Sequence, residues 1–280
     1  MSDPTTSEST VARRATRRLT PVRLGTAAVA ASLFAAVLTG CGSDDSSTSS
    51  SSTAATATGA LPEAAQIVQE SARTTQTLQA VHLELEVENI QNLPVEKVDA
   101  DVTNQPQGQG AAQGSATVRT KPDAPFVEAD FVVVDKSIWV KLEDGKFADL
   151  GPSEKVYDPG IILDKDKGLA NVIAKVQNPK VEGRESVEGT AVVKVSGTID
   201  SAVIDPIVPR VGEGGGTFPI TLYIADVAPP STSAAAKPSD APSAGDGPNL
   251  VRAVIEKGDG TINVTLSDWA EPVTVTKPAN

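Results

Sequence analysis

The sequence predicts an α+β fold in which an antiparallel sheet with one apolar and one solvated face packs against a few helices. Two observations support this class. Apolar and polar residues alternate along several short segments, as in half-buried strands. Other segments repeat their apolar residues every three or four positions, as amphipathic helices do. A chain of 280 residues with a single cysteine must stabilise such a fold by a packed core rather than by disulfide bonds.

Residues 1–40 are predicted to be a lipoprotein signal peptide. Five arginines precede the apolar segment Leu24–Leu38, which is shorter than the roughly 20 residues that a transmembrane helix needs. Cys41, the only cysteine, follows directly after Leu38-Thr39-Gly40. A lipoprotein signal peptidase would cleave before Cys41 once its thiol is acylated. The alternative is an ordinary secretory signal with a cysteine at its cleavage site, and Sec rather than twin-arginine export is the default.

Residues 41–60 are predicted to comprise the acylated Cys41 and a flexible tether. From Ser43 to Gly59 the chain is almost entirely Ser, Thr, Ala and Asp, a composition that buries too little apolar surface to order itself. Flexible-chain scaling gives such a segment a reach of about 20 Å. Two or more acyl chains on Cys41 would hold the folded body close to the membrane.

The chain is acidic, with a net charge of −12. Its first 40 residues carry five arginines against Asp3 and Glu8, so the remainder is more acidic still. This balance excludes nucleic acid as a partner.

Residues 61–280 are predicted to form a single domain that begins with a helix and a strand. Glu63–Gln79 has one apolar stripe and follows Pro62. Residues 81–88 then alternate between apolar side chains and His82 or glutamate, which predicts a strand with one acidic face.

The same alternation predicts further strands within 127–133, 138–142, 193–195, 220–224, 251–255 and 262–266. Asp135-Lys136 and Gly258-Asp259-Gly260 are predicted hairpin turns. The charged segment Val181–Glu185 is also interpreted as a hairpin turn.

Three further helices are predicted in the second half of the chain. Asp158-Pro159 has the character of a helix start leading to Leu163, Gly168–Val176 carries one apolar side, and Ser201–Val208 is a short helix interrupted by proline. The Ala/Pro/Ser-rich residues 228–249 are predicted to be a disordered insert.

The sequence lacks the groups that catalysis uses, which predicts that the protein is not an enzyme and has no cofactor. His82 is the only histidine, and its place on an acidic strand face favours a solvated residue over a general base. There is no G-x-S-x-G elbow, no H-E-x-x-H and no glycine-rich phosphate loop.

Two acidic segments have some features of metal sites but lack others that such sites need. Asp164–Gly168 is similar to the start of a calcium loop but lacks the later acidic ligands. Glu84, Glu86 and Glu88 repeat along one strand face about 7 Å apart, where water solvates them. We therefore expect no metal site.

The apolar residues are mainly Val, Ile, Leu and Ala, and aromatic residues make up only 3% of the chain. This argues against a sugar-binding cleft built from aromatic platforms. A cavity lined in this way suits flexible acyl chains, although composition by itself favours a filled core.

Several segments, in order, resemble the LppX/LprA/LprF/LprG lipoproteins of mycobacteria and their relatives, and the LprG branch looks nearest. The resemblance covers most of residues 61–280. The segments that carry it are Glu128–Val133, Asp149–Pro152, Tyr157–Pro159, Gly168–Val172, Val181–Arg184, Leu266–Trp269 and Val273–Pro278.

The resemblance implies a strongly curved antiparallel β half-barrel, with helices packed on its concave face around a hydrophobic cavity, similar to bacterial lipoprotein carriers. It also implies an envelope lipoprotein on the outer face of the cell membrane. Such a protein would bind triacylated glycolipids or triacylglycerols and carry them toward the outer envelope with a major facilitator superfamily transporter. The family offers no catalytic residues. The alternative is a non-carrier structural or adhesive surface lipoprotein with a filled core.

If a cavity forms, we expect the inward-facing strand residues to line it and the helix stripes to close it. The expected lining residues are Ile67, Val68, Leu78, Leu83, Leu85, Val87, Val127, Phe131, Val133, Val140, Leu169, Val172, Val176, Val193, Val195, Leu222 and Val264.

Overall fold

The computed structural model of the chain describes residues 60–106, 109–121, 123–142, 145–227 and 245–279. These residues all belong to one compact unit that spans Ser52–Asn280. The predicted signal peptide, Cys41, the tether up to Gly59 and residues 228–244 of the predicted insert lie outside the described residues. Within the described part of the chain, no helix is both long enough and apolar enough to cross a membrane.

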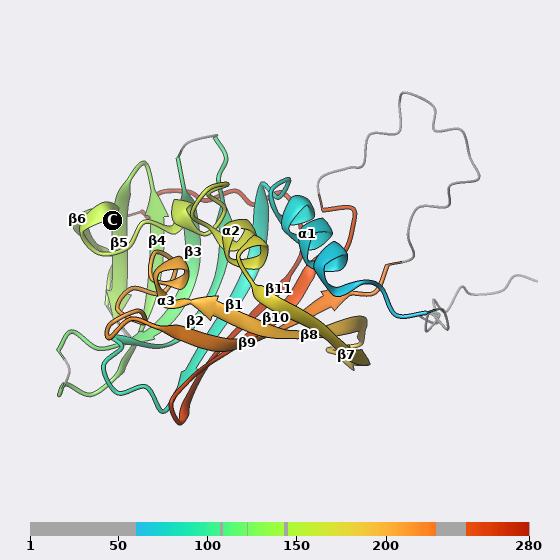
Figure 1. The fold of residues 1–280 in the computed structure, drawn as a ribbon. Coiled ribbons are helices and arrows are strands. Elements are labelled where there is room, and N and C mark those ends of the chain that lie inside the picture. Colours follow the sequence, from blue (N-terminus) through green and yellow to red (C-terminus); the bar gives the residue numbers. More distant parts are fainter. Residues whose placement is uncertain (1–59, 107–108, 122, 143–144, 228–244, 280) are drawn as a thin grey trace, which may run out of the picture. The chain divides into compact units, whose positions relative to one another are not determined.

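The described strands form a single antiparallel sheet of 11 strands in the order β6-β5-β4-β3-β2-β1-β11-β10-β9-β8-β7 (Figure 1). Two meanders, β1–β6 and β7–β11, therefore meet where β1 pairs with β11. The strands are β1 (Ala80–Glu88), β2 (Val95–Thr103), β3 (Ala111–Val118), β4 (Val127–Val134), β5 (Ser137–Leu142), β6 (Ala148–Pro152), β7 (Gln177–Val187), β8 (Thr190–Asp200), β9 (Thr217–Ala225), β10 (Leu250–Lys257) and β11 (Gly260–Ser267).

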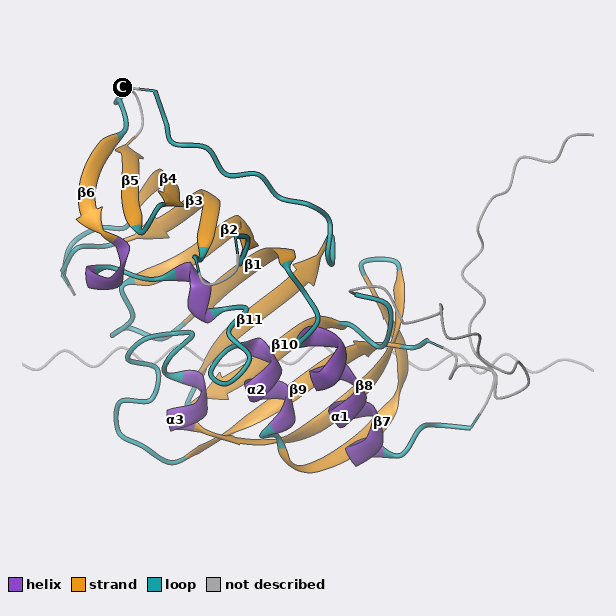
Figure 2. Cartoon of the chain, turned by 90° about the horizontal axis from the view of Figure 1, so that it is seen from above, coloured by secondary structure: helices purple, strands orange, loops and turns teal. Residues whose placement is uncertain are grey.

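The helices are short and gather on one face of the sheet, which we call the inner face (Figure 2). They are α1 (Ala64–Thr75), α2 (Leu169–Ala174) and α3 (Ser201–Ile204), with the 3₁₀ turns η1 (Ser153–Lys155) and η2 (Pro159–Ile161). The Glu63 carboxylate caps α1 by accepting hydrogen bonds from the backbone N–H groups of Ala65 and Gln66. Helix α1 contacts β7, β9 and α2, whereas α3 contacts β8 and η2 contacts β2 and β3.

Alternation along most strands separates an apolar inner face from a polar outer face, and a second, smaller apolar cluster of Val187, Val192, Ala225 and Val251 is buried apart from the main core. On β1, Leu83 and Leu85 are buried on the inner face, whereas Glu86 and Glu88 on the outer face are exposed. The inner residues and the buried sides of α1 and α2 join in one continuous hydrophobic core. The predicted one-sided sheet is therefore present, but the fold is mostly β, with fewer helical residues than an α+β class suggests.

Every predicted helix is present in shortened form. The predicted Glu63–Gln79 helix ends at Thr75, and Gly168–Val176 contains the six-residue α2. The predicted helix from Asp158 to Leu163 is only the turn η2, and Ser201–Val208 contains the four-residue α3. Short helices of this kind gain stability mainly from packing on the sheet, because isolated helices shorter than about 12 residues are marginal in water.

Two of the three predicted hairpin turns are confirmed. Asp135 and Lys136 both have positive φ, 51° and 61°, as a two-residue turn between right-twisted strands requires. Gly258, at φ 63°, opens the turn between β10 and β11. The predicted turn at Val181–Glu185 is wrong, because this segment lies inside β7, and the chain turns later, at Glu188-Gly189. Strand β7 is an edge strand on which Glu182 and Glu185 are exposed, whereas Arg184 pairs with Asp226 at 2.6 Å.

The C-terminal segment after β11 runs back along the β1–β6 half of the sheet (Figure 2). The Lys277 ammonium lies 4.8 Å from the ring centroid of Trp139 on β5. Trp139 pairs with Val132, on the opposite side of the sheet from Phe131, yet it is only 3% exposed. It is thus buried outside the main core.

Candidate functional site

The inner face is the candidate site, and its two halves differ in how well they are covered. Over strands β8–β11 the inner side chains are completely enclosed, because α1, α2 and α3 pack on this half (Figure 2). The inner residues with no exposed surface here are Val193, Val195, Ile199, Leu222, Ile224 and Ile262.

The inner face of strands β2–β5 is only partly covered. On this face Val98 of β2 pairs with Ala116 of β3, and Phe131 of β4 pairs with Val140 of β5; each of the four is partly exposed. Small side chains lie among them: Ala100, Ala112, Gly114 and Ala129. This half of the face therefore presents an apolar surface that the helices do not seal, and we call it the open half.

The segment before α2 holds the edge of the open half in place. Gly160 of η2 lies so close to Gly110, which precedes β3, that a Cβ on Gly110 would come within 2.2 Å of the Gly160 Cα. The Asp158 carboxylate accepts a hydrogen bond from the Gly160 N–H at 3.0 Å. The Tyr157 hydroxyl donates to the Ile207 carbonyl at 2.9 Å, and burial raises the pKa of Tyr157, so the phenol stays neutral.

Most of the residues expected to line a cavity lie in the hydrophobic core. Phe131 packs against that core, Val133 is buried outside it, Val140 is partly exposed, and Val127 at the start of β4 is 43% exposed. The residues inside the core are Ile67, Val68, Leu78, Leu83, Leu85, Val87, Leu169, Val172, Val176, Val193, Val195, Leu222 and Val264.

Sequence reasoning missed β2 and β3, and with them the centre of the open half. The inner positions are Val98, Ala100 and Val102 on β2, and Ala112, Gly114 and Ala116 on β3. Alanine and glycine give β3 almost no period-two signal, whereas Val98 and Val102 of β2 do alternate with Asp99 and Asp101.

Two pockets, of about 370 and 250 Å³, are formed by described residues on the outer face. The first includes His82, Asp99 and Asp101, and the second includes Glu84, Glu188 and Arg252. Neither is the apolar cavity that the resemblance implies. A lipid cavity therefore remains a proposal about the open half.

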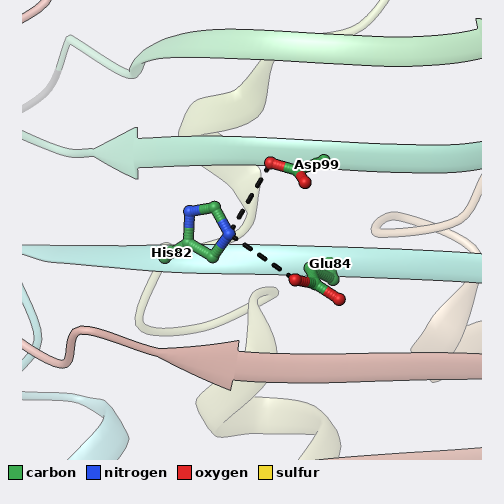
Figure 3. Close-up of side chains that lie close together, drawn as sticks. All are labelled: His82, Glu84 and Asp99. Atoms are coloured by element: carbon green, nitrogen blue, oxygen red, sulfur yellow. Dashed lines mark ion pairs between the residues drawn. The ribbon is translucent and has the colours of Figure 1, made fainter.

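The outer face of β1 and β2 brings His82 against several carboxylates (Figure 3). His82 Nδ1 lies 2.9 Å from an Asp101 oxygen, whereas Nε2 lies 3.6 Å from Asp99 and 4.0 Å from Glu84. Partial burial acts to lower the pKa of His82, but the hydrogen bond to Asp101 and the charges of Asp99, Asp101 and Asp268 outweigh it and raise that pKa.

This arrangement predicts a pH dependence of stability. Glu84 on β1, Asp99 and Asp101 on β2, and Asp268 after β11 favour the imidazolium, so the folded chain holds this proton more tightly than the unfolded chain. Stability from this group is fully present below the ordinary pKa of 6.5 and is lost as pH rises through the raised folded pKa. We expect urea unfolding in EDTA to show a loss of up to about 1 kcal/mol between about pH 6 and pH 8. His82→Gln should remove this slope, and an unchanged slope would contradict the assignment.

Solved structures define the class of protein. The chain matches the crystal structure of LprF from Mycobacterium bovis with a TM-score of 0.69 and 52% identity, over 79% of this chain and 99% of that one. It matches the Mycobacterium tuberculosis lipoprotein LppX with a TM-score of 0.51 and 26% identity, over 76% of this chain and 97% of that one. The fold is thus that of mycobacterial lipoproteins, with a one-sided antiparallel sheet and helices on its inner face.

The chain belongs to the LppX_LprAFG lipoprotein family, whose model matches residues 63–275. The LprF protein of Mycobacterium bovis, whose name proposes diacylated glycolipid transport, is 50% identical over 92% of this chain and 94% of its own length. A protein of Mycolicibacterium hassiacum named lipoarabinomannan carrier protein LprG is 35% identical over 91% of this chain and 97% of its own length. The expectation that the LprG branch is nearest is therefore wrong.

Family membership carries two further conclusions. The relatives are lipoproteins of a carrier family and not enzymes, in agreement with the sparse catalytic inventory of the sequence. A lipoprotein of this family is an exported protein anchored to a membrane.

Proposed function

We propose that the chain binds multi-acylated glycolipids on the open half of its inner face and carries them from the plasma membrane toward the outer envelope. The observation that carries the proposal is the contrast between the two halves. Helices seal the core over β8–β11, whereas apolar positions such as Val98, Phe131 and Val140 stay partly exposed over β2–β5. An apolar surface that a protein leaves partly open is typical of a ligand site.

The composition of the open half indicates the kind of ligand. It combines branched aliphatic residues with alanines, one phenylalanine and few polar groups, which suits flexible acyl chains. The names of LprF and LprG relatives describe a diacylated glycolipid and lipoarabinomannan, which supports a glycolipid headgroup left in water. Diacylated glycolipids are accordingly the first candidates, followed by triacylated glycolipids and triacylglycerols.

Carriage overcomes a large free-energy barrier. Moving a lipid with about 40 methylene groups through water would cost roughly 30 kcal/mol, at about 0.8 kcal/mol per group. An apolar protein surface provides an environment close to that of the bilayer, so loading and release can be nearly balanced. An acylated Cys41 would keep the carrier at the membrane, where a major facilitator superfamily transporter would act with it.

A structural or adhesive surface lipoprotein with a filled core is the second candidate. The complete burial of Val193, Leu222 and Ile262 favours it, since that half of the interior has no exposed apolar surface. The two candidates differ in whether lipid occupies the open half.

Native mass spectrometry separates the two candidates. Residues 42–280, which contain the whole compact unit, would be expressed in a glycolipid-producing actinobacterial host and analysed before and after lipid extraction. We expect an acylated species at close to one molecule per protein, and fragmentation would identify its headgroup and chain number. A folded protein without lipid would overturn carriage and favour the structural role.

A further inference from the structure

The outer face holds a group of metal-ligating atoms that the lipid-carrying role does not use. His82 and Glu84 lie two residues apart on β1, so both side chains emerge on the same face of the sheet. In the pairing of β1 with β2, Asp99 lies opposite Glu84 and Asp101 lies opposite His82. We propose that His82, Glu84 and Asp99 bind one Zn²⁺ ion on the outer face of β1 and β2, with Asp101 orienting the histidine.

The spacing of the three ligand atoms fits a single ion. His82 Nε2 lies 3.6 Å from an Asp99 oxygen and 4.0 Å from a Glu84 oxygen, and all three atoms lie within 4.8 Å of one another. Zn–N and Zn–O bonds of about 2.0–2.2 Å in tetrahedral geometry place ligand atoms about 3.3 Å apart. The Glu84 and Asp99 side chains are 46% and 48% exposed, so small rotations can close the remaining gap.

Asp101 gives the imidazole the orientation that a metal ligand needs. Its carboxylate lies 2.9 Å from Nδ1, so Nδ1–H donates to Asp101. Nε2 faces Glu84 and Asp99 (Figure 3), and once zinc displaces the proton of the imidazolium its lone pair is directed at the ion. A carboxylate hydrogen-bonded to the distal nitrogen of a histidine is a common outer-shell partner of zinc ligands, where it fixes the tautomer and raises ligand basicity.

The surroundings allow the ion to enter and complete its coordination. The pocket of about 370 Å³ includes both His82 and Asp99, which leaves room for water as a fourth ligand. Asp130 also lines this pocket, where it pairs with Lys141 at 2.9 Å. One imidazole nitrogen with two carboxylates favours zinc over calcium or magnesium, which prefer oxygen ligands alone. A bound ion would link β1 to β2, and the earlier expectation of no metal site would then be revised.

The single histidine of the chain makes the site directly observable by NMR. The full chain carrying Cys41→Ser, which removes the only thiol, would be purified in detergent without a histidine tag and freed of metal with EDTA. Zn²⁺ should then shift the imidazole resonances in a titration that saturates at one ion per chain. Mg²⁺ and Ca²⁺ at the same concentrations should leave these resonances unchanged.

Variants identify the ligands. Calorimetric titration with Zn²⁺ should show an affinity at least tenfold lower for Asp99→Asn and for His82→Gln, and about 10–100-fold lower for Asp101→Asn. Glu88→Gln, on the same face of β1 but outside the cluster, should bind zinc as the parent chain does. Imidazole resonances that do not respond to Zn²⁺ would overturn the proposal. The proposal would also be overturned if His82→Gln and Asp99→Asn, each with the circular dichroism of the parent chain, bound Zn²⁺ with unchanged affinity.

Discussion

Leu222→Ala is expected to lower the free energy of unfolding by about 2–5 kcal/mol. Leu222 has no exposed surface and lies on the inner face of β9 between Val195 of β8 and Ala253 of β10. Removing three carbon atoms from a packed core loses their transfer free energy and leaves a cavity. Urea denaturation of residues 42–280, followed by circular dichroism, would measure the change.

Thr221→Ala provides the matched control for this substitution. Thr221 is the neighbour of Leu222 on β9 but faces the outer side, where a small truncation should change stability by no more than about 0.5 kcal/mol. A loss below about 1 kcal/mol for Leu222→Ala would contradict a packed core over β8–β11. It would indicate instead that the cavity expected from the sequence extends into this half.

Ala116→Trp is expected to reduce lipid loading about tenfold while the fold remains stable. Ala116 is a partly exposed inner residue of β3, between Val98 of β2 and Ala129 of β4. An indole at this position would displace about two methylene groups of an acyl chain, each contributing about 0.8 kcal/mol to burial. The lipid-to-protein ratio in native mass spectrometry, with circular dichroism of the same sample, would measure both effects.

Thr117→Trp places the same bulk on the opposite face of the same strand, where Thr117 lies between Lys97 and Glu128. It should leave lipid loading at the parental level. Equal loading in both variants would remove the open half as the lipid site. Equal loss in both would point to a general effect of tryptophan on β3.

The strand predictions succeeded where alternation was carried by branched residues. Leu83 and Leu85 on β1, and Ile262 and Val264 on β11, are buried on the inner face as their spacing indicates. Strand β3 was missed because Ala112 and Gly114 occupy its inner positions, and β2 was missed although Val98 and Val102 alternate with Asp99 and Asp101. Gly183 made part of β7 look like a turn, although it lies at a register shift between β7 and β8.

The candidate sites, too, could be predicted from the sequence only in part. His82 and the glutamates of β1 were identified as one polar face, which is a local property of a strand. Asp99 and Asp101 joined them only through the β1–β2 register, which the residues of one strand do not determine. The residues predicted to line a cavity were recognised as inward-facing, yet spacing gives no information on which of them a helix covers.

The sequence by itself determined the one-sided antiparallel sheet, the family resemblance and the absence of a catalytic apparatus, because these follow from local periodicity and residue type. Only the tertiary structure decided that α1, α2 and α3 cover β8–β11 and leave β2–β5 partly open. It alone also placed Asp99 and Asp101 beside His82. Both outcomes depend on contacts between different elements, helix with sheet in the first case and strand with strand in the second, which no one segment sets by itself.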